Sequence, residues 1–166
     1  TAASGAAMTA GLTAPLAAVG FSSIQAASKA EEAQARFESV FQNTSDQVSE
    51  FADTFADEIG RSEHTIENMA ANFGSMLNPM LESEERVAEL STEFTKLTQD
   101  LASFENRNPA KVQRDLQSAL AGQSETVRKY GVDLSQARLK QMGLTEESSR
   151  AEEAQLRLQA IIEDTQ

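Results

Sequence analysis

The stretch MLESEERVAELSTEFTKLTQDLASF, residues 80–104, decides the fold class. Apolar residues recur along it at steps of seven, three, four, three, four and three, and charged residues fill most positions between them. This spacing forms one apolar stripe on an α-helix, so the stretch predicts a helix that joins a coiled coil or a bundle. We expect the stripe to contact other helices or other copies of the chain, through Val87, Leu90, Phe94, Leu97, Leu101 and Phe104. Burial inside one chain and contact between copies suit the stripe equally.

The segments on either side carry the same helical spacing. Toward the N-terminus, we expect one helix from about Pro15 to Phe41, a second that ends at Gly60, and a third from Ser62 to Pro79. Toward the C-terminus, shorter helices are expected over 109–122, 124–131 and 133–143, and a last one from Thr145. The second helix has its own apolar stripe, and we expect it also to contact helices or copies, through Phe51, Phe55 and Ile59.

Strands are not expected, because β-branched and aromatic residues nowhere alternate with polar ones over five or more positions. We therefore predict an all-α protein of several amphipathic helices of unequal length, jointed at Gly and Pro. These helices are expected to form an elongated helical bundle or a coiled-coil oligomer. The Gly and Pro joints suit a compact bundle and an end-to-end rod equally well.

Charge divides the 166 residues, whose net charge is −12, into three parts. Residues 1–28 carry no charged side chain, residues 29–105 carry 17 acidic and 5 basic ones, and residues 106–166 carry nine of each. We therefore distinguish an uncharged apolar segment, an acidic helical region that contains the stripe, and a charge-balanced helical region. The acidic balance disfavours specific binding to nucleic-acid phosphates.

The uncharged segment has two candidate uses, which are burial between protein chains and contact with a membrane. It is long enough to span a bilayer, but its Gly, Pro, Ser and Thr residues leave it weakly hydrophobic. The sequence does not begin with Met and shows no basic stretch before the apolar start, so we expect a segment of a longer protein. The apolar residues expected to pack at an axis or against a membrane are Leu12, Leu16, Val19, Phe21 and Ile24.

Motifs that support catalysis are missing from the sequence. It has no Cys and one histidine, His64, so cysteine nucleophiles, thiolate zinc sites and paired-histidine metal motifs are excluded. Adjacent acidic pairs such as Glu84-Glu85 point in different directions on a helix and suit a solvated face. No glycine-rich phosphate-binding motif is present. We expect a protein that is not an enzyme and that has no cofactor and no metal site.

Six stretches of the sequence, taken in their order along the chain, are similar to a known family of proteins. They are GLTAPL (11–16), FADTFADEIGRS (51–62), LTQDLASFEN (97–106), LQSALAGQSE (116–125), RKYGVDLS (128–135) and AEEAQLRLQAII (151–162). Together they resemble the core region of bacteriophage tail tape-measure proteins. The resemblance covers most of residues 11–165, and the chain shows none of the lytic or peptidase modules that such proteins often carry.

The resemblance implies a structural protein of the virion, located in the tail lumen or tail tip and in the host cytoplasm during assembly. Such a protein sets tail length, scaffolds assembly of the tail tube, and is released when the genome is ejected. Its implied partners are further copies of itself, with a trimer preferred, the tail-tube and tail-tip or hub proteins, and, transiently, the host membrane. The alternative is a helical effector or pore-forming segment that inserts residues 1–28 into membranes.

Overall fold

The computed structural model describes residues 27–165. Within this range every regular element is a helix and there is no strand, which confirms the predicted all-α class. The chain divides into two compact units, residues 1–36 and residues 37–166. Of the first unit the structure describes residues 27–36, which are helical.

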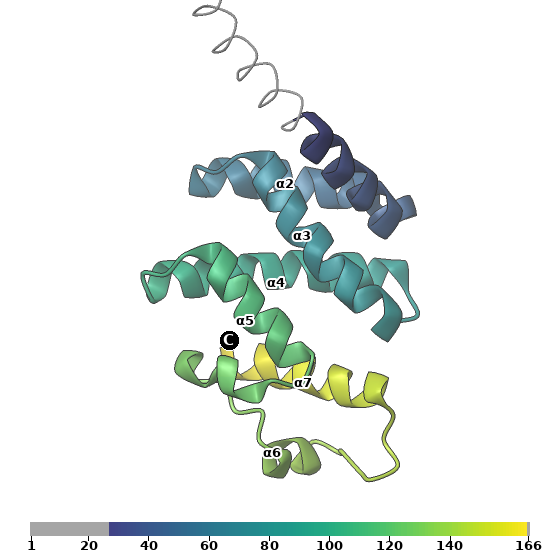
Figure 1. Cartoon of the computed structure of the whole chain (residues 1–166), viewed down its shortest axis with the longest axis vertical. Helices are drawn as coiled ribbons and strands as arrows, with labels where there is room; N and C mark the ends of the chain where they lie inside the picture. The colour runs from purple at the N-terminus through teal and green to yellow at the C-terminus, as the bar shows by residue number, and fades with distance from the viewer. Residues whose placement is uncertain (1–26, 166) are drawn as a thin grey trace, which may run out of the picture. The chain divides into compact units, whose positions relative to one another are not determined.

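The second unit opens with helical residues 37–41 and contains the remaining elements (Figure 1). Most of its α-helices are joined by turns of only a few residues, and short 3-10 turns lie between some of them. In chain order the elements are η1 (Gln42–Thr44), α2 (Ser45–Ile59), α3 (Glu63–Leu77), η2 (Asn78–Met80), α4 (Glu84–Phe104), α5 (Pro109–Leu120), η3 (Ser124–Thr126), η4 (Arg128–Tyr130), α6 (Gln136–Gln141) and α7 (Arg150–Thr165).

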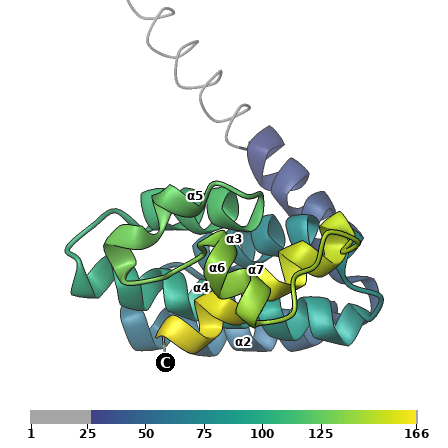
Figure 2. The ribbon, with the colours of Figure 1, turned by 90° about the horizontal axis from the view of Figure 1, so that it is seen from below.

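Consecutive helices of this unit fold back on one another. In Figure 1, α2, α4 and α7 lie roughly parallel in one row, while α3 and α5 cross them obliquely in a second row. Figure 2 shows the two rows from below, with α3 and α5 on one side and α2, α4 and α7 on the other. The chain contacts agree, because α3 packs against α2 and α4, and α5 packs against α4 and α7. At these joints the chain therefore turns back, so that consecutive helices pack against one another.

One hydrophobic core runs through most of the second unit. Its centre includes Phe41, Phe73 and Phe94, and the rings of Phe73 and Phe94 lie 5.4 Å apart between centroids. Leu116 and Ile161 belong to the same cluster, so residues from the acidic and the charge-balanced regions share one core. A smaller cluster fills the space between α2 and α3, and it consists of Ala52, Phe55, Ala56 and Ile66.

Local signals in the sequence explain where the first helices end and begin. Gly60 has φ 64°, a left-handed conformation that glycine adopts readily, and its N–H donates to carbonyl groups of the last turn of α2. Ser62 then caps α3 by accepting a hydrogen bond from the Thr65 N–H. Asn108 caps α5 in the same way, and Pro109 occupies the first turn, where a missing N–H is tolerated. The predicted boundaries at Gly60, Ser62 and Pro109 are thereby confirmed.

The C-terminal third differs from the predicted helices. Residues 124–131 form two 3-10 turns, and the helix expected over 133–143 is confined to α6. The last helix begins at Arg150 and not at Thr145, because Ser149 and Glu152 form a reciprocal capping box. The Ser149 N–H donates to the Glu152 carboxylate at 2.7 Å, and the Ser149 hydroxyl accepts from the Glu152 N–H at 3.2 Å.

Candidate functional site

The predicted stripe on α4 faces three different environments. Val87, Leu90 and Phe94 are fully buried in the main core. Leu97 and Leu101 are half-buried and pack against the edge of that core. Phe104, at the end of the helix, is 86% exposed. The first five residues therefore contact other parts of the same chain, and Phe104 alone among the six offers a large free apolar surface.

The buried face of α4 is wider than a heptad seam because it also contains polar side chains. Thr95 and Thr98 are fully buried, and each hydroxyl donates to the carbonyl oxygen four residues earlier at 2.7 Å. Gln99 is buried as well, and its amide contacts the Met69 sulfur. Hydrogen bonds within the helix satisfy the threonines, so they can enter the core without a partner from another helix. Apolar periodicity cannot detect such positions.

The stripe on α2 is also divided between core and surface. Phe55 is 8% exposed and belongs to the smaller cluster, and the half-buried Phe51 stacks on it with 5.3 Å between ring centroids. The ammonium group of Lys96 lies over the Phe51 ring at 5.3 Å. Ile59 is 37% exposed at the end of the helix. The predicted residues of the uncharged segment lie outside the described residues, and they are Leu12, Leu16, Val19, Phe21 and Ile24.

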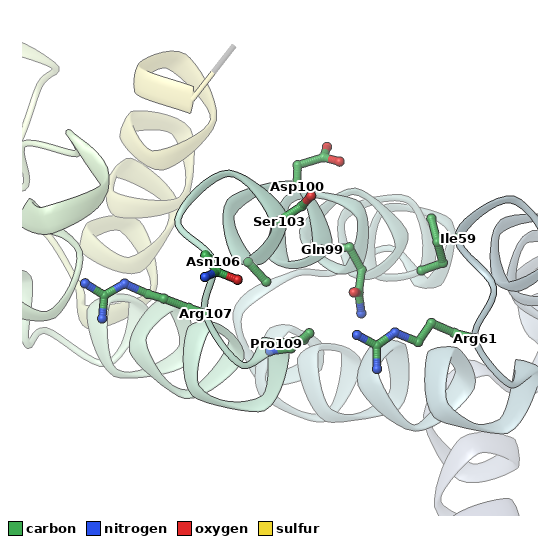
Figure 3. Close-up of a pocket in the computed structure, with 9 residues that line it drawn as sticks. Ile59, Arg61, Gln99, Asp100, Ser103, Asn106, Arg107 and Pro109 are labelled. Atoms are coloured by element: carbon green, nitrogen blue, oxygen red, sulfur yellow. The ribbon is translucent and has the colours of Figure 1, made fainter.

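Ile59 borders a groove of about 410 Å³ where α2, α4 and α5 meet. Figure 3 shows its lining, with the Gln99 amide and the Arg61 guanidinium directed toward each other across the groove. Asn106 and Pro109 lie along the side formed by the α4–α5 turn (Figure 3). We call this the turn groove. It combines the exposed Ile59 side chain with arginine and amide groups.

Two helix ends position the arginines of the turn groove. Arg61 follows the left-handed Gly60, and its N–H donates to the Ala56 carbonyl at 2.9 Å. Arg107 follows Asn106, a non-glycine residue with φ 49°, and its N–H donates to the Ala102 carbonyl at 2.8 Å. Both arginines are thus held by backbone bonds that end a helix. Sequence analysis missed this groove because its walls come from residues about 40 positions apart.

The turn groove offers binding chemistry. A guanidinium group presents several N–H donors in a fixed plane, which suits carboxylates and peptide carbonyls. Gln99 and Asn106 add amides that both donate and accept. Ile59 adds one exposed apolar side chain beside these groups.

A cluster of titratable side chains lies elsewhere, between α5 and the 3-10 turn η4. Asp115 accepts hydrogen bonds from the Lys129 ammonium and, at 2.8 Å, from the Tyr130 hydroxyl. Partial burial works against ionisation of Asp115, but these two bonds outweigh it and lower the pKa of the carboxyl group. Burial and the bond to Asp115 raise the pKa of the Tyr130 phenol. The cluster therefore ties η4 to α5.

His64, the one imidazole of the chain, lies on the surface at the start of α3, where Nδ1 is 3.9 Å from the Glu67 carboxylate. Within residues 27–165, no three His, Cys, Asp or Glu residues are placed so that they could share a metal ion. Among the described helices, none is both long and apolar enough to cross a membrane. Comparison with protein-family models, with curated proteins and with solved structures finds no match for the chain.

Proposed function

We propose that this chain is a structural segment of a tail tape-measure protein in a phage or phage-like particle. In that role it helps to set tail length, scaffolds polymerisation of the tail tube, and leaves the tail when the genome is ejected. The observation that carries the proposal is the order of the six stretches between residues 11 and 162, each similar to the core region of such proteins. The all-helical fold is consistent with it.

The fold refines what the second unit contributes to such a protein. A straight helix of about 130 residues would be roughly 195 Å long, at about 1.5 Å per residue. Because the helices of this unit fold back on one another, it spans far less length than that. We infer that residues 37–166 serve as a docking module for neighbouring tail proteins and other copies, and that each of these residues adds less to tail length than a residue of a straight helix would.

Surface chemistry supports a docking role without catalysis. The turn groove offers arginine and amide donors beside an exposed Ile59, and Phe104 adds a second apolar contact near the end of α4. The acidic surface disfavours adhesion to the phosphates of DNA that passes through the tube. The proposed partners are tail-tube and tail-tip or hub proteins and other copies of the chain, with three copies preferred.

Genetic replacement in the particle tests this proposal. We expect deletion of residues 37–166 from the encoding gene to abolish tails or to change tail length in electron micrographs. The matched variant Arg61→Ala with Phe104→Ser leaves the core intact, and we expect it to reduce the yield of tails while the protein stays folded. Tails of normal length and number from the deletion would contradict the proposal.

The uncharged segment supports a second candidate, a helical effector that acts on membranes. Residues 1–28 have no charge and contain five large apolar residues within positions 12–24. Leakage of dye from liposomes caused by a peptide of residues 1–42 would favour this function. Failure of the peptide to release dye at any lipid composition would remove it.

A further inference from the structure

The solvent side of α5 is basic. Lys111 and Arg114 are exposed, and at about 100° per residue they lie about 140° and 160° around the helix from the buried Leu116. Arg107, two residues before the helix, is also exposed. We call Arg107, Lys111 and Arg114 the basic face of α5.

The cations of this face have little carboxylate contact within the chain. Among residues 27–165, neither Lys111 nor Arg114 is in an ion pair, and Arg107 has only the Glu105 carboxylate near it, at 3.8 Å. Asp115, one turn after Lys111, already accepts hydrogen bonds from another lysine and from a tyrosine. The net charge of the chain is −12, so these cations stay free despite an excess of carboxylates.

The solvent side of α2 is acidic, and this helix contains no basic residue. Asp46, Glu50, Asp53 and Asp57 follow one another at steps of four, three and four, so they line one side of the helix, and all four are exposed. Glu50 and Asp57 lie about 160° and 140° around the helix from the buried Ala52. Among residues 27–165, none of these four carboxylates is in an ion pair. We call these four residues the acidic face of α2.

The two faces complement each other in charge and in spacing. The members of the basic face are four and then three residues apart, and the same steps occur in the acidic face in both chain directions. Two helices that lie side by side, parallel or antiparallel, can therefore bring three cations opposite three carboxylates. Within one copy the faces cannot meet, because α2 and α5 lie on opposite sides of the second unit and each face points away from the core (Figure 2).

We propose that the basic face of α5 binds the acidic face of α2 on a second copy of this chain. Because two different surfaces meet, the contact is heterologous, and it repeats from copy to copy in a closed ring or in an open line. The inference rests on the proposed function only in that both involve several copies of the chain. Its test in solution is separate from any measurement on tails.

This contact has to overcome the repulsion between two copies that each have a net charge of −12. At physiological ionic strength the Debye length is about 8 Å, so charges elsewhere on the two copies are largely screened from each other. Carboxylates and cations that touch are screened less. Since each exposed pair contributes little, we expect a weak, reversible contact that high salt disrupts.

Reciprocal charge reversal in the full chain tests this inference. The acidic-face variant carries Glu50→Lys with Asp53→Lys, and the basic-face variant carries Lys111→Glu with Arg114→Glu; all four positions are exposed, so the fold should persist. Each variant alone places like charges opposite each other. We expect its self-association constant, from analytical ultracentrifugation in about 0.15 M salt, to fall at least about tenfold. In an equimolar mixture of the two variants every altered face meets an opposite charge, so association should return to within about threefold of the native protein.

Matched controls separate the contact from a general effect of net charge. Glu146→Lys with Glu147→Lys changes the net charge as the acidic-face variant does, and Lys140→Glu with Arg150→Glu changes it as the basic-face variant does. These four residues are exposed and belong to neither face. Both controls should associate within about threefold of the native protein.

Carbodiimide crosslinking locates the contact in the native protein, because this reagent joins a lysine amine to a carboxylate that touches it. In a mixture of ordinary and ¹⁵N-labelled protein, we expect links between different copies that connect Lys111 to the acidic face of α2. This measurement needs no substitution, so it decides the question even if a variant fails to fold.

Four results would overturn the inference. The first is a native protein that stays monomeric at concentrations up to about 1 mM, which would leave the two faces to other partners. The second is a mixture of the two folded variants that associates no better than either variant alone. The third is an equal loss of association in the net-charge controls. The fourth is a set of links between copies that omits Lys111 or the acidic face. Circular dichroism of each variant shows whether the fold is retained.

Discussion

Gly74, inside α3, is a position where adding one methyl group should destabilise the protein, although alanine favours helices. A Cβ atom at Gly74 would lie 2.5 Å from Val40 Cγ1 and 2.9 Å from Phe41 Cζ, both closer than ordinary van der Waals contact. Val40 is β-branched and therefore stiff, and Phe41 is fully buried, so neither can move aside freely. The helix at residues 37–41 approaches α3 closely because residue 74 has no side chain.

Two opposing effects decide whether Gly74→Ala raises or lowers the free energy of unfolding. Replacing glycine by alanine inside a helix stabilises it by about 1 kcal/mol. Overpacking a tight core costs about 1–3 kcal/mol. We therefore expect Gly74→Ala to lower the free energy of unfolding by about 1 kcal/mol and the melting temperature by about 3 °C.

Urea unfolding followed by circular dichroism measures this effect. The control is Ser75→Ala, the next residue of the same helix, which is exposed and whose hydroxyl donates only to the Ala71 carbonyl. We expect this control to be neutral or to gain about 0.5 kcal/mol from helix propensity. If Gly74→Ala were instead about 1 kcal/mol more stable than the native protein, the close packing of residues 40 and 41 on α3 would be wrong.

Three further predictions concern the core, a titrating cluster and a helix cap. Phe94→Ala should lower the free energy of unfolding by about 3–5 kcal/mol, and Phe104→Ala, at the exposed end of the same stripe, should change it by less than about 0.5 kcal/mol in the same urea titration. Asp115→Asn should lower the free energy of unfolding by about 1–2 kcal/mol at neutral pH, because the hydrogen bonds from Lys129 and Tyr130 lose a charged acceptor. Because the folded pKa of Asp115 lies below its usual 3.8, its contribution is present above that pH and disappears as the pH falls through the lowered value, so native protein and variant should converge in acid melts. If the difference in stability between the native protein and Asp115→Asn were the same at pH 7 and below pH 3, the link between Asp115 ionisation and stability would be refuted. Ser149→Ala should lower the free energy of unfolding by about 1 kcal/mol in thermal melts, because α7 loses its cap, and a change near zero would exclude the capping box.

Local chemistry predicts much of the first half of the fold. The positions of Gly60, Ser62 and Pro109 follow from backbone requirements that one residue meets alone, so the sequence contains the complete signal. The burial of Phe73 and Phe94 follows from helical spacing, because an apolar residue in line with others must face the core.

Other features depend on contacts that periodicity does not encode. The burial of Thr95 and Thr98 depends on hydroxyl bonds back to the helix, so two polar residues occupy core positions. Helical spacing places Phe104 in the same stripe as Phe94, but among residues 27–165 no helix covers the Phe104 side chain, which is 86% exposed. The capping box of Ser149 and Glu152 is visible in the sequence, although the acidic residues after Thr145 suggested an earlier start.

The surface hollows could not be predicted, since each depends on how distant helices meet. The turn groove joins residues near position 60 to residues near position 105, and another hollow, lined by Leu90 and Leu158, lies between α4 and the C-terminal helix α7. Sequence spacing reports which face of each helix is apolar. The three-dimensional packing determines which part of that face remains uncovered.

Crosslinking mass spectrometry of intact tails, purified from the phage or phage-like particle that encodes this chain, tests the tape-measure proposal most directly. We predict a few copies of the chain per tail, in a multiple of three, linked to tail-tube or tail-tip proteins and lost from the particles after DNA release. Purified tails of normal length that contain no peptide of this chain would contradict the proposal.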